Sequence, residues 1–431
     1  MKITKALIML IALIFIYISP IFSLSILDKP LTDPFESEVE LKNFDRLDHL
    51  SDADNQYLDN SSISLLTKDP GKDIYSWFGH TSILIETPQS SIIYDYGVFS
   101  FDSDNFYTNF LQGKMYYLLY VSYLDQSLTI SKSQERSVDI IKLEINNEQK
   151  ASIINFLNYN SQDSNRTYLY DFYKDNCATR IRDIFNWITE DDFKTWAQNK
   201  KSTGTFRELA NRSLSKNPLI FWCLNSLQGQ AADEVGSVWD DMYLPTHLQM
   251  AVRNYEKLGN TELSLYKSEI APPPVENENN NHILLYSIFS LIISLVALAF
   301  KRAKQIRNSK IYGIFNIIIL SFLLIITSAI FFLSFFSSIN AAWYNENLVF
   351  LNPLTIIMMM ILAIRILSKK KEPLKKIIQF ERGSRWYAHI IFVLFILKLI
   401  FSATLFQNNL NIMLPIWIYF ITQGTMLRSK K

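Results

Sequence analysis

The residues best suited to chemistry in this 431-residue chain lie in the segment YLYDFYKDNCATRIRDIFNWI, which runs from Tyr168 to Ile188. The alternating aromatic residues at its start are typical of a strand edge, and the apolar residues of its second half have helical spacing. Cys177 therefore falls at or beside a helix N-terminus, where unpaired N–H groups and the helix dipole favour a thiolate. This position can activate a nucleophile, although a lone cysteine is as often a buried structural residue.

A thiol nucleophile needs a base that takes its proton and a third group that orients the base. His80 lies near the start of a predicted strand at 77–86, which we expect to pair with a second strand at 91–101 through a tight turn. Asp95 and Tyr96 lie on the second strand, close enough to bond the imidazole if the strands pair. The competing interpretation is that His80 is a half-buried packing residue, which is the commoner role of a lone histidine in a strand.

Other features of the sequence limit the chemistry. The remaining histidines before the apolar C-terminal blocks are weaker candidates for the base: His49, in a polar segment; His247, in a predicted helix; and His282, at the membrane boundary. Only two cysteines occur, and a Cys177–Cys223 bridge is the alternative that would abolish the nucleophile. The sequence has no zinc spacing, nucleotide fingerprint or Gly-rich phosphate loop, so we predict no metal and no cofactor. A formal net charge of +1 gives no indication of nucleic-acid binding.

The region around these residues has the mixed composition of a soluble domain. Its patterns predict a first strand around 57–66, a further strand at 137–145 and a helix at 147–158. The aromatic-rich segment 106–124 is expected to be core or the lining of a groove. After the Cys177 helix we expect mostly helical structure to about residue 258, with segments at 205–209, 218–227 and 244–258.

Two segments flank this domain. Residues 1–26 have the basic start and apolar core of an export signal, and they fit both a cleaved signal peptide and a retained signal anchor. Either form directs export of the domain after it. The Pro- and Asn-rich segment 271–282 has no core-forming capacity, so we predict a linker between an exported domain at 27–270 and a membrane domain at 283–431.

The membrane domain contains five apolar blocks, and we predict about five transmembrane helices at 283–300, 311–336, 348–366, 388–406 and 410–424, the last of marginal length. Lys and Arg fill the loops 301–310 and 369–385 and the C-terminal tail, whereas the connections 337–347 and 407–409 contain neither. By the positive-inside rule, the basic loops and the C-terminus are cytoplasmic and the domain before the first span lies outside. Lys398, within the fourth block, is compatible with a bundle interior, a lipid head group or snorkelling.

Five motifs in this order resemble the N-terminal periplasmic domain of the Lnb family of bacterial lipoprotein N-acyltransferases: GHTSILIE, YDYGVFSFD, NFYTNFLQGKMYYL, ERSVDIIKLEI and YLYDFYKDNCATRIRD. The resemblance covers roughly residues 65–250, and the membrane segments after it also look like that family's arrangement. The NCATR motif with the upstream GH pair is specific, and the aromatic stretches are supporting. The order of histidine before cysteine is also similar to permuted NlpC-type papain-like folds, including the lecithin:retinol acyltransferases.

The resemblance implies an α+β fold, in which an exported papain-like domain of permuted NlpC type precedes a helical transmembrane bundle. It implies transfer of an acyl chain from a membrane phospholipid to the N-terminal amine of an exported diacylated lipoprotein, at the bacterial inner membrane. Cys177 and His80 match the nucleophile and the base. Asp95 stands where many relatives have Asn and is the expected orienter of the base, with Glu86 as the alternative. We expect three further residues to bind substrate: Asn176, Arg180 and Tyr96.

Two other functions fit parts of the same pattern. A peptidoglycan amidase or endopeptidase of NlpC type would use the same cysteine and histidine in the same compartment, but it needs at most one membrane anchor. A membrane receptor or assembly factor with an inactive papain-like domain would not need to retain His80 and Cys177. Several apolar blocks favour an enzyme whose two substrates both lie in the bilayer.

The export signal and the basic loops of the membrane domain both predict the topology of the protein, and this topology can be tested directly. Residues 27–282 are expected in the periplasm and Lys431 in the cytoplasm, because the export signal and the basic loops agree. Alkaline phosphatase folds to an active enzyme only outside the cytoplasm, so a fusion to the C-terminus should be inactive. An active C-terminal fusion would contradict the topology.

Overall fold

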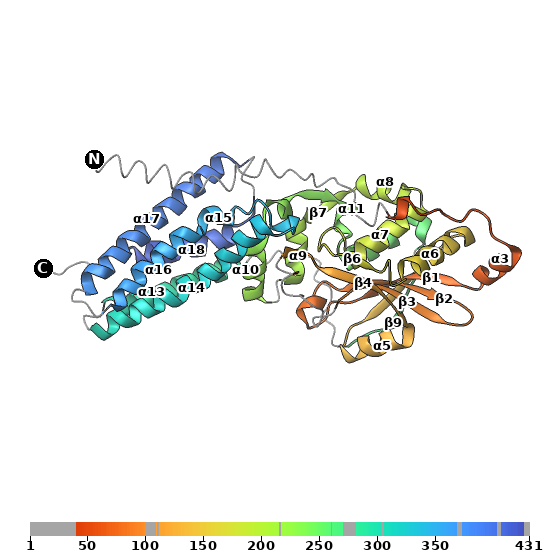
Figure 1. Cartoon of the computed structure of the whole chain (residues 1–431), viewed down its shortest axis with the longest axis horizontal. Coiled ribbons are helices and arrows are strands. Elements are labelled where there is room, and N and C mark those ends of the chain that lie inside the picture. The colour runs from red at the N-terminus through yellow and green to blue at the C-terminus, as the bar shows by residue number, and fades with distance from the viewer. Residues whose placement is uncertain are drawn as a thin grey trace. The chain divides into compact units, whose positions relative to one another are not determined.

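The computed structural model describes residues 40–99, 109, 112–214, 217–259, 261–269, 282–302, 306–368, 373–402 and 407–425. The protein is α+β, with a sheet-rich N-terminal part and a helical C-terminal part (Figure 1), as the sequence predicts. It divides into two compact units, a sheet unit (described residues 40–214 and 234–269) and a helical unit (described residues 217–233 and 282–425). The predicted export signal and nearly all of the predicted linker lie outside the described residues.

A seven-stranded antiparallel sheet organises the sheet unit, in the spatial order β6-β4-β3-β2-β1-β5-β9. The strands are β1 (Ser62–Lys68), β2 (His80–Glu86), β3 (Ser91–Val98), β4 (Tyr116–Tyr123), β5 (Val138–Lys142), β6 (Thr167–Leu169) and β9 (Thr261–Tyr266). A short turn joins β2 to β3, and Ile83 lies opposite Tyr94. This register puts the beginning of β2 beside the second half of β3.

Helices cover both faces of the sheet (Figure 1). The larger core lies under α6 (Asn147–Asn160), α7 (Cys177–Ile188) and α12 (Pro245–Asn254), where Ile83 and Phe185 are fully buried. A smaller core on the opposite face, beside α5 (Leu124–Ser133), contains Leu66, Leu84 and Ile140. Because side chains alternate along each strand, this two-sided burial explains why the central strands are apolar on both faces.

Two predicted strands begin later in the structure than the pattern suggests. Helix α3 (Asp52–Asp59) occupies the start of the predicted strand at 57–66, because the Ser51 hydroxyl accepts from the Asp54 N–H in a capping box that begins a helix there. Strand β2 begins at His80 instead of residue 77, because the 3-10 turn η2 (Ile74–Ser76) and the positive φ of Gly79 (+81°) turn the chain first.

The region after α7 is less helical than predicted. Two short strands, β7 (Lys201–Thr205) and β8 (Val235–Ser237), pair with each other, and β9 adds an edge strand to the main sheet. Each pairing joins segments far apart in the sequence, so local periodicity could not indicate it. Besides α12, α10 (Pro218–Leu227) and η3 (Gln230–Asp233), the helical elements of this region are α8 (Asp192–Gln198), α9 (Phe206–Leu214), α11 (Val238–Asp241) and η4 (Glu256–Leu258).

The described residues of the helical unit contain three helices long and apolar enough to cross a membrane, at Ile283–Lys301, Ser309–Phe336 and Leu374–Ile400. A pair of shorter helical segments, Asn340–Phe350 and Pro353–Leu367, makes a fourth span if it is counted as one, although it is bent by 44°. Helix α18 (Leu410–Gln423) has 14 residues and is too short for a bilayer core about 30 Å thick. The predicted count of five spans therefore remains a prediction. The full helices are α13 (Ile283–Arg302), α14 (Ile306–Phe336), η5 (Asn340–Ala342), α15 (Asn347–Phe350), α16 (Pro353–Leu367) and α17 (Pro373–Ile400).

One segment of the predicted exported domain belongs to the helical unit. Helix α10 (Pro218–Leu227), followed by η3 (Gln230–Asp233), packs on α14 and α18. In addition to this packing, the Asn347 side-chain amide donates a hydrogen bond to the Ser226 carbonyl (3.0 Å). Nearby, the ammonium of Lys398 pairs with Glu346 and donates to the Gln407 carbonyl (2.6 Å). Lys398 therefore faces polar groups inside the unit.

Gly79 provides a test of how the chain enters β2. A Cβ at this position would lie 3.0 Å from the Lys68 carbonyl oxygen, and its φ of +81° disfavours any side chain. Gly79→Ala should therefore destabilise the sheet unit by about 1–3 kcal/mol. Hydrogen exchange measured by mass spectrometry should be faster in peptides from β1 and β2. Gly204→Ala is the control, because Gly204 has no positive φ and its nearest neighbour is the flexible Glu208 carboxylate; equal protection in the two variants would contradict the assignment.

Candidate active site

The start of α7 is fixed by a side-chain cap. Asn176 is the N-cap residue, and its amide oxygen accepts from the N–H groups of Ala178 (2.8 Å) and Thr179 (3.0 Å). Its amide nitrogen donates to the carbonyls of Phe172 (2.6 Å) and Tyr243 (3.0 Å). The cap makes Cys177 the first residue of the helix, at the positive end of the helix dipole, as the sequence predicts.

The structure brings the three predicted catalytic residues together. His80 is the first residue of β2, and the β2–β3 register puts Asp95 diagonally beside it on the same face of the sheet. The Nε2 atom of His80 bonds to the Asp95 carboxylate, which leaves Nδ1 available for the thiol. The side chains of His80 and Cys177 lie close together, since a Cβ built on Gly97 would be 3.9 Å from the Cε1 of His80 and 3.6 Å from the Cβ of Cys177. Glu86 lies at the other end of β2 and takes no part in this arrangement.

The charges of these three groups stabilise one another. Burial lowers the pKa of His80, but the Asp95 and Cys177 charges outweigh it and raise that pKa to about 9. Burial raises the pKa of Cys177, but the imidazolium of His80 and its hydrogen bond bring that pKa below its ordinary value. The pKa of Asp95 is lowered to about 2, because the His80 charge and hydrogen bond outweigh the effect of burial. The site therefore favours a thiolate–imidazolium pair beside a carboxylate near neutral pH.

The structure also places a lysine in this cluster. Lys68 lies at the end of β1 directly opposite His80, and its ammonium is 3.7 Å from the second oxygen of Asp95. The side chain of Lys68 is only 10% exposed, so the ion pair is well shielded from water. Asp95 thus has a cation on each side, which keeps its carboxylate ionised. The sequence signal that could have found Lys68 is the β1–β2 pairing, since a charged residue ending an apolar strand falls opposite the predicted base.

The three residues predicted to bind substrate have internal partners. Asn176 uses both ends of its amide in the cap. Arg180 makes a bidentate ion pair with Asp175, at 2.6 and 2.9 Å, and its side chain is 5% exposed. The hydroxyl of Tyr96 donates to Asn160 (2.6 Å). These contacts give each residue a structural role, and contact with substrate stays a prediction.

Both cysteines are free in the structure. Within the residues that the structure describes, no cluster of three His, Cys, Asp or Glu side chains is arranged to hold a metal ion. Cys223 lies on α10, half-buried, and burial raises the pKa of its thiol. The two thiols therefore differ in kind, because the pKa of Cys177 is lowered and that of Cys223 is raised.

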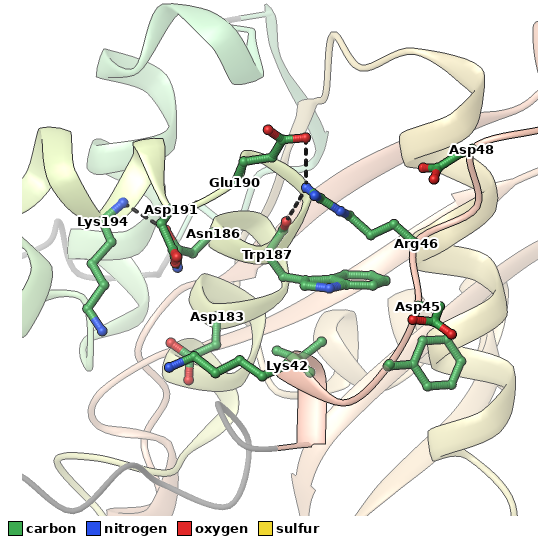
Figure 2. Close-up of a pocket in the computed structure, with 12 residues that line it drawn as sticks. Lys42, Asp45, Arg46, Asp48, Asp183, Asn186, Trp187, Glu190, Asp191 and Lys194 are labelled. Carbon is green, nitrogen blue, oxygen red and sulfur yellow. Dashed lines mark hydrogen bonds and ion pairs between the residues drawn. The ribbon is translucent and has the colours of Figure 1, made fainter.

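A pocket of about 490 Å³ lies along another part of α7 (Figure 2). Its lining comes from the segment 41–48, from the second half of α7 and from residues 190–194. Arg46 extends across it, pairing with the Glu190 carboxylate (3.1 Å) and donating to the Trp187 carbonyl (3.2 Å). The lining contains no thiol and no histidine, so this pocket lacks the groups that the predicted chemistry needs.

The ion pair predicts a pH dependence. Asp95 raises the pKa of His80, so Asp95→Asn should lower that pKa, weaken the imidazolium that stabilises the thiolate and raise the pKa of Cys177. In a Cys223→Ser background, the pH midpoint of iodoacetamide alkylation should rise by at least about one unit. One unit corresponds to about 1.4 kcal/mol in the free energy of ionising the thiol. Asp125→Asn, on the first turn of α5, is the matched control and should leave the midpoint unchanged. If the alkylation midpoint is the same with and without Asp95→Asn, the assignment of Asp95 to this cluster is wrong.

Comparison with known proteins gives one match. Residues 51–212 match the family model described as the Lnb N-terminal periplasmic domain. The matched segment contains Cys177, His80 and Asp95, together with β1 to β7. Searches of curated proteins and of solved structures return no match. The match to residues 51–212 agrees with the resemblance to the Lnb family that the sequence motifs indicated.

Proposed function

We propose that this protein is a membrane-bound acyltransferase that moves a fatty acyl chain from a phospholipid to the N-terminal amine of a diacylated lipoprotein. The observation that carries the proposal is the cluster of Cys177, His80 and Asp95, in which His80 bonds to Asp95 and lies beside a thiol at a helix N-terminus. The Lnb-type domain and the membrane-length helices in the same chain support lipid substrates. The enzyme would act at the inner membrane, with its sheet unit in the periplasm and its C-terminus in the cytoplasm.

The reaction divides into two steps. In the first, the Cys177 thiolate attacks the ester carbonyl carbon of the phospholipid, a C–S bond forms, and the C–O bond to the glycerol breaks. The His80 imidazolium gives its proton to the leaving alkoxide. In the second, the lipoprotein amine attacks the thioester, His80 takes the amine proton, and the C–S bond breaks to restore the thiolate. Asp95 orients the ring of His80 and stabilises its charged form throughout.

A cysteine suits this transfer because an amine attacks a thioester faster than it attacks an oxygen ester. The covalent intermediate also keeps the acyl chain on the protein between the two steps. A peptidoglycan amidase would use the same three residues, so only the substrate on which the protein acts distinguishes an amidase from the proposed acyltransferase. An inactive receptor would need none of them, and the lowered pKa of Cys177 argues against that role.

The two half-reactions can be separated by experiment. With phospholipid vesicles and no lipoprotein, the wild-type protein should gain the mass of one acyl chain, and hydroxylamine should remove it. Cys177→Ser should fold but gain no acyl chain and lose nearly all transfer, because an unactivated hydroxyl is a poor nucleophile. His80→Ala should acylate about 10²–10⁴-fold more slowly, having lost its acid–base group. Cys223→Ser is the matched control and should behave as wild type.

The outcome that would remove Cys177 as the nucleophile has two parts. The wild-type protein would show no acyl adduct by mass spectrometry, and Cys177→Ser would convert diacylated to triacylated lipoprotein at a comparable rate. Cleavage of peptidoglycan fragments without any acyl transfer would favour the amidase.

A further inference from the structure

A buried tyrosine beside Cys177 has a hydroxyl with no hydrogen-bond partner among the described residues. Tyr168 lies on β6, opposite Tyr117 of β4, and is 4% exposed. Two other tyrosine hydroxyls of this unit have acceptors: Tyr94 donates to Asn158 (2.7 Å) and Tyr243 to the Phe206 carbonyl (2.9 Å). A buried, unpaired hydroxyl is unfavourable, so its retention needs an explanation.

The position of Gly97 shows where this hydroxyl lies relative to the nucleophile. A Cβ built on Gly97 would be 3.6 Å from the Cβ of Cys177, 3.8 Å from the Oη of Tyr168 and 3.9 Å from the Cε1 of His80. These are ordinary van der Waals distances, so the three groups lie around the side of Gly97 where another residue would carry its side chain. Gly97 has a φ of +91°, which side chains rarely adopt, so the backbone itself keeps this space free of a side chain.

The hydroxyl is suited to donate a hydrogen bond. Burial raises the pKa of Tyr168 well above its usual value, so the group keeps its proton throughout the physiological range. The guanidinium of Arg180 lies 3.7 Å from the centre of its ring and acts in the opposite direction, making the O–H more polar. Arg180 is in turn held by its bidentate pair with Asp175. Tyr168 is thus a neutral donor fixed in place by a buried cation.

We infer that the Tyr168 hydroxyl is a catalytic donor that binds the carbonyl oxygen of the acyl group during attack by Cys177. This assignment rests on the proposed thioester chemistry and adds the group that stabilises its transition state. As the C–S bond forms, the carbonyl π electrons move to oxygen, which enters the space beside Gly97 and accepts from Tyr168. When the tetrahedral intermediate collapses, the C=O bond re-forms and the C–O bond to the alcohol breaks, with the leaving oxygen protonated by His80.

The helix N-terminus offers a second donor, the backbone N–H of Cys177. Asn176 caps the N–H groups of Ala178 and Thr179, and its contacts do not include the N–H of Cys177 itself. A pair of donors, one from a side chain and one from the backbone of the nucleophile, is a common way to bind a developing oxyanion. Tyr168 is the member of the pair that mutation can remove without altering the backbone.

Tyr168→Phe removes the hydroxyl and keeps the ring on which Arg180 lies. In a Cys223→Ser background, the p-nitrophenyl ester of a short fatty acid serves as acyl donor, and the rate of Cys177 acylation is followed by mass spectrometry. The rate should fall about 10²–10³-fold, the usual effect of losing one oxyanion donor. Alkylation of Cys177 by iodoacetamide develops no oxyanion, so its rate and pH midpoint should stay within about twofold and 0.3 unit of the parent.

Tyr94→Phe is the matched control, because it removes a satisfied hydroxyl from β3 of the same sheet. It should leave acylation unchanged and lower the thermal unfolding midpoint, whereas Tyr168→Phe should leave that midpoint unchanged or raise it. The inference is overturned if Tyr168→Phe acylates as fast as Tyr94→Phe, if alkylation slows as much as acylation, or if the ester does not acylate the parent protein.

The failure of the proposed function has a different signature. If the ester acylates Cys177 in a Tyr168-dependent way, but neither phospholipid donates nor a lipoprotein amine accepts the chain, the lipoprotein assignment falls and the role of Tyr168 stands.

Discussion

The amide of Asn176 is the contact on which the candidate site depends. One end of it closes the first turn of α7, and the other end binds the carbonyls of Phe172 and Tyr243, which come from the loop before the helix and from the segment before α12. A single side chain therefore fixes where the helix begins and where that beginning lies in the unit. Because the thiol is on the first residue of the helix, any movement of this cap moves the nucleophile relative to His80.

Charge pairing explains how so many ionisable groups are buried near one thiol. Lys68 and His80 flank Asp95, and Arg180 is paired with Asp175, which lies two residues before Cys177 in the chain. A charge removed from water without a partner is strongly unfavourable, so each group needs the others to remain ionised. The free-energy cost of burying these charges is offset because each charge has a partner held close to it. The register of β1, β2 and β3 positions Lys68, His80 and Asp95, and the first turn of α7 positions Arg180 beside Asp175. Within the first of these groups the ionisations are coupled, so removing the charge of one residue alters the pKa of its neighbours.

The sequence was sufficient to predict that the three main residues of the candidate site lie together, but not to predict which other side chains surround them. Cys177 could be placed at a helix start because the change from alternating to helical spacing falls next to it, and His80 with Asp95 could be paired because two adjacent strands alternate clearly. Lys68 and the hydroxyl of Tyr168 could not be assigned, since their positions depend on β1–β2 and β4–β6 pairing between distant segments. The same reason accounts for the missed β7, β8 and β9. Where the apolar helices of the helical unit begin and end depends on caps and bends that hydropathy does not report.

Helix α10 affects the order in which this protein can fold. Its apolar residues are synthesised before α13 to α18, yet in the structure they pack on α14 and α18, and Trp222 belongs to the core of the helical unit. The sheet unit is completed by β9, which also precedes those helices in the chain. During synthesis, therefore, this apolar helix emerges before the helices on which it packs, between two parts of a unit that can already form. Its apolar surface therefore lacks these packing partners until the later helices have been synthesised.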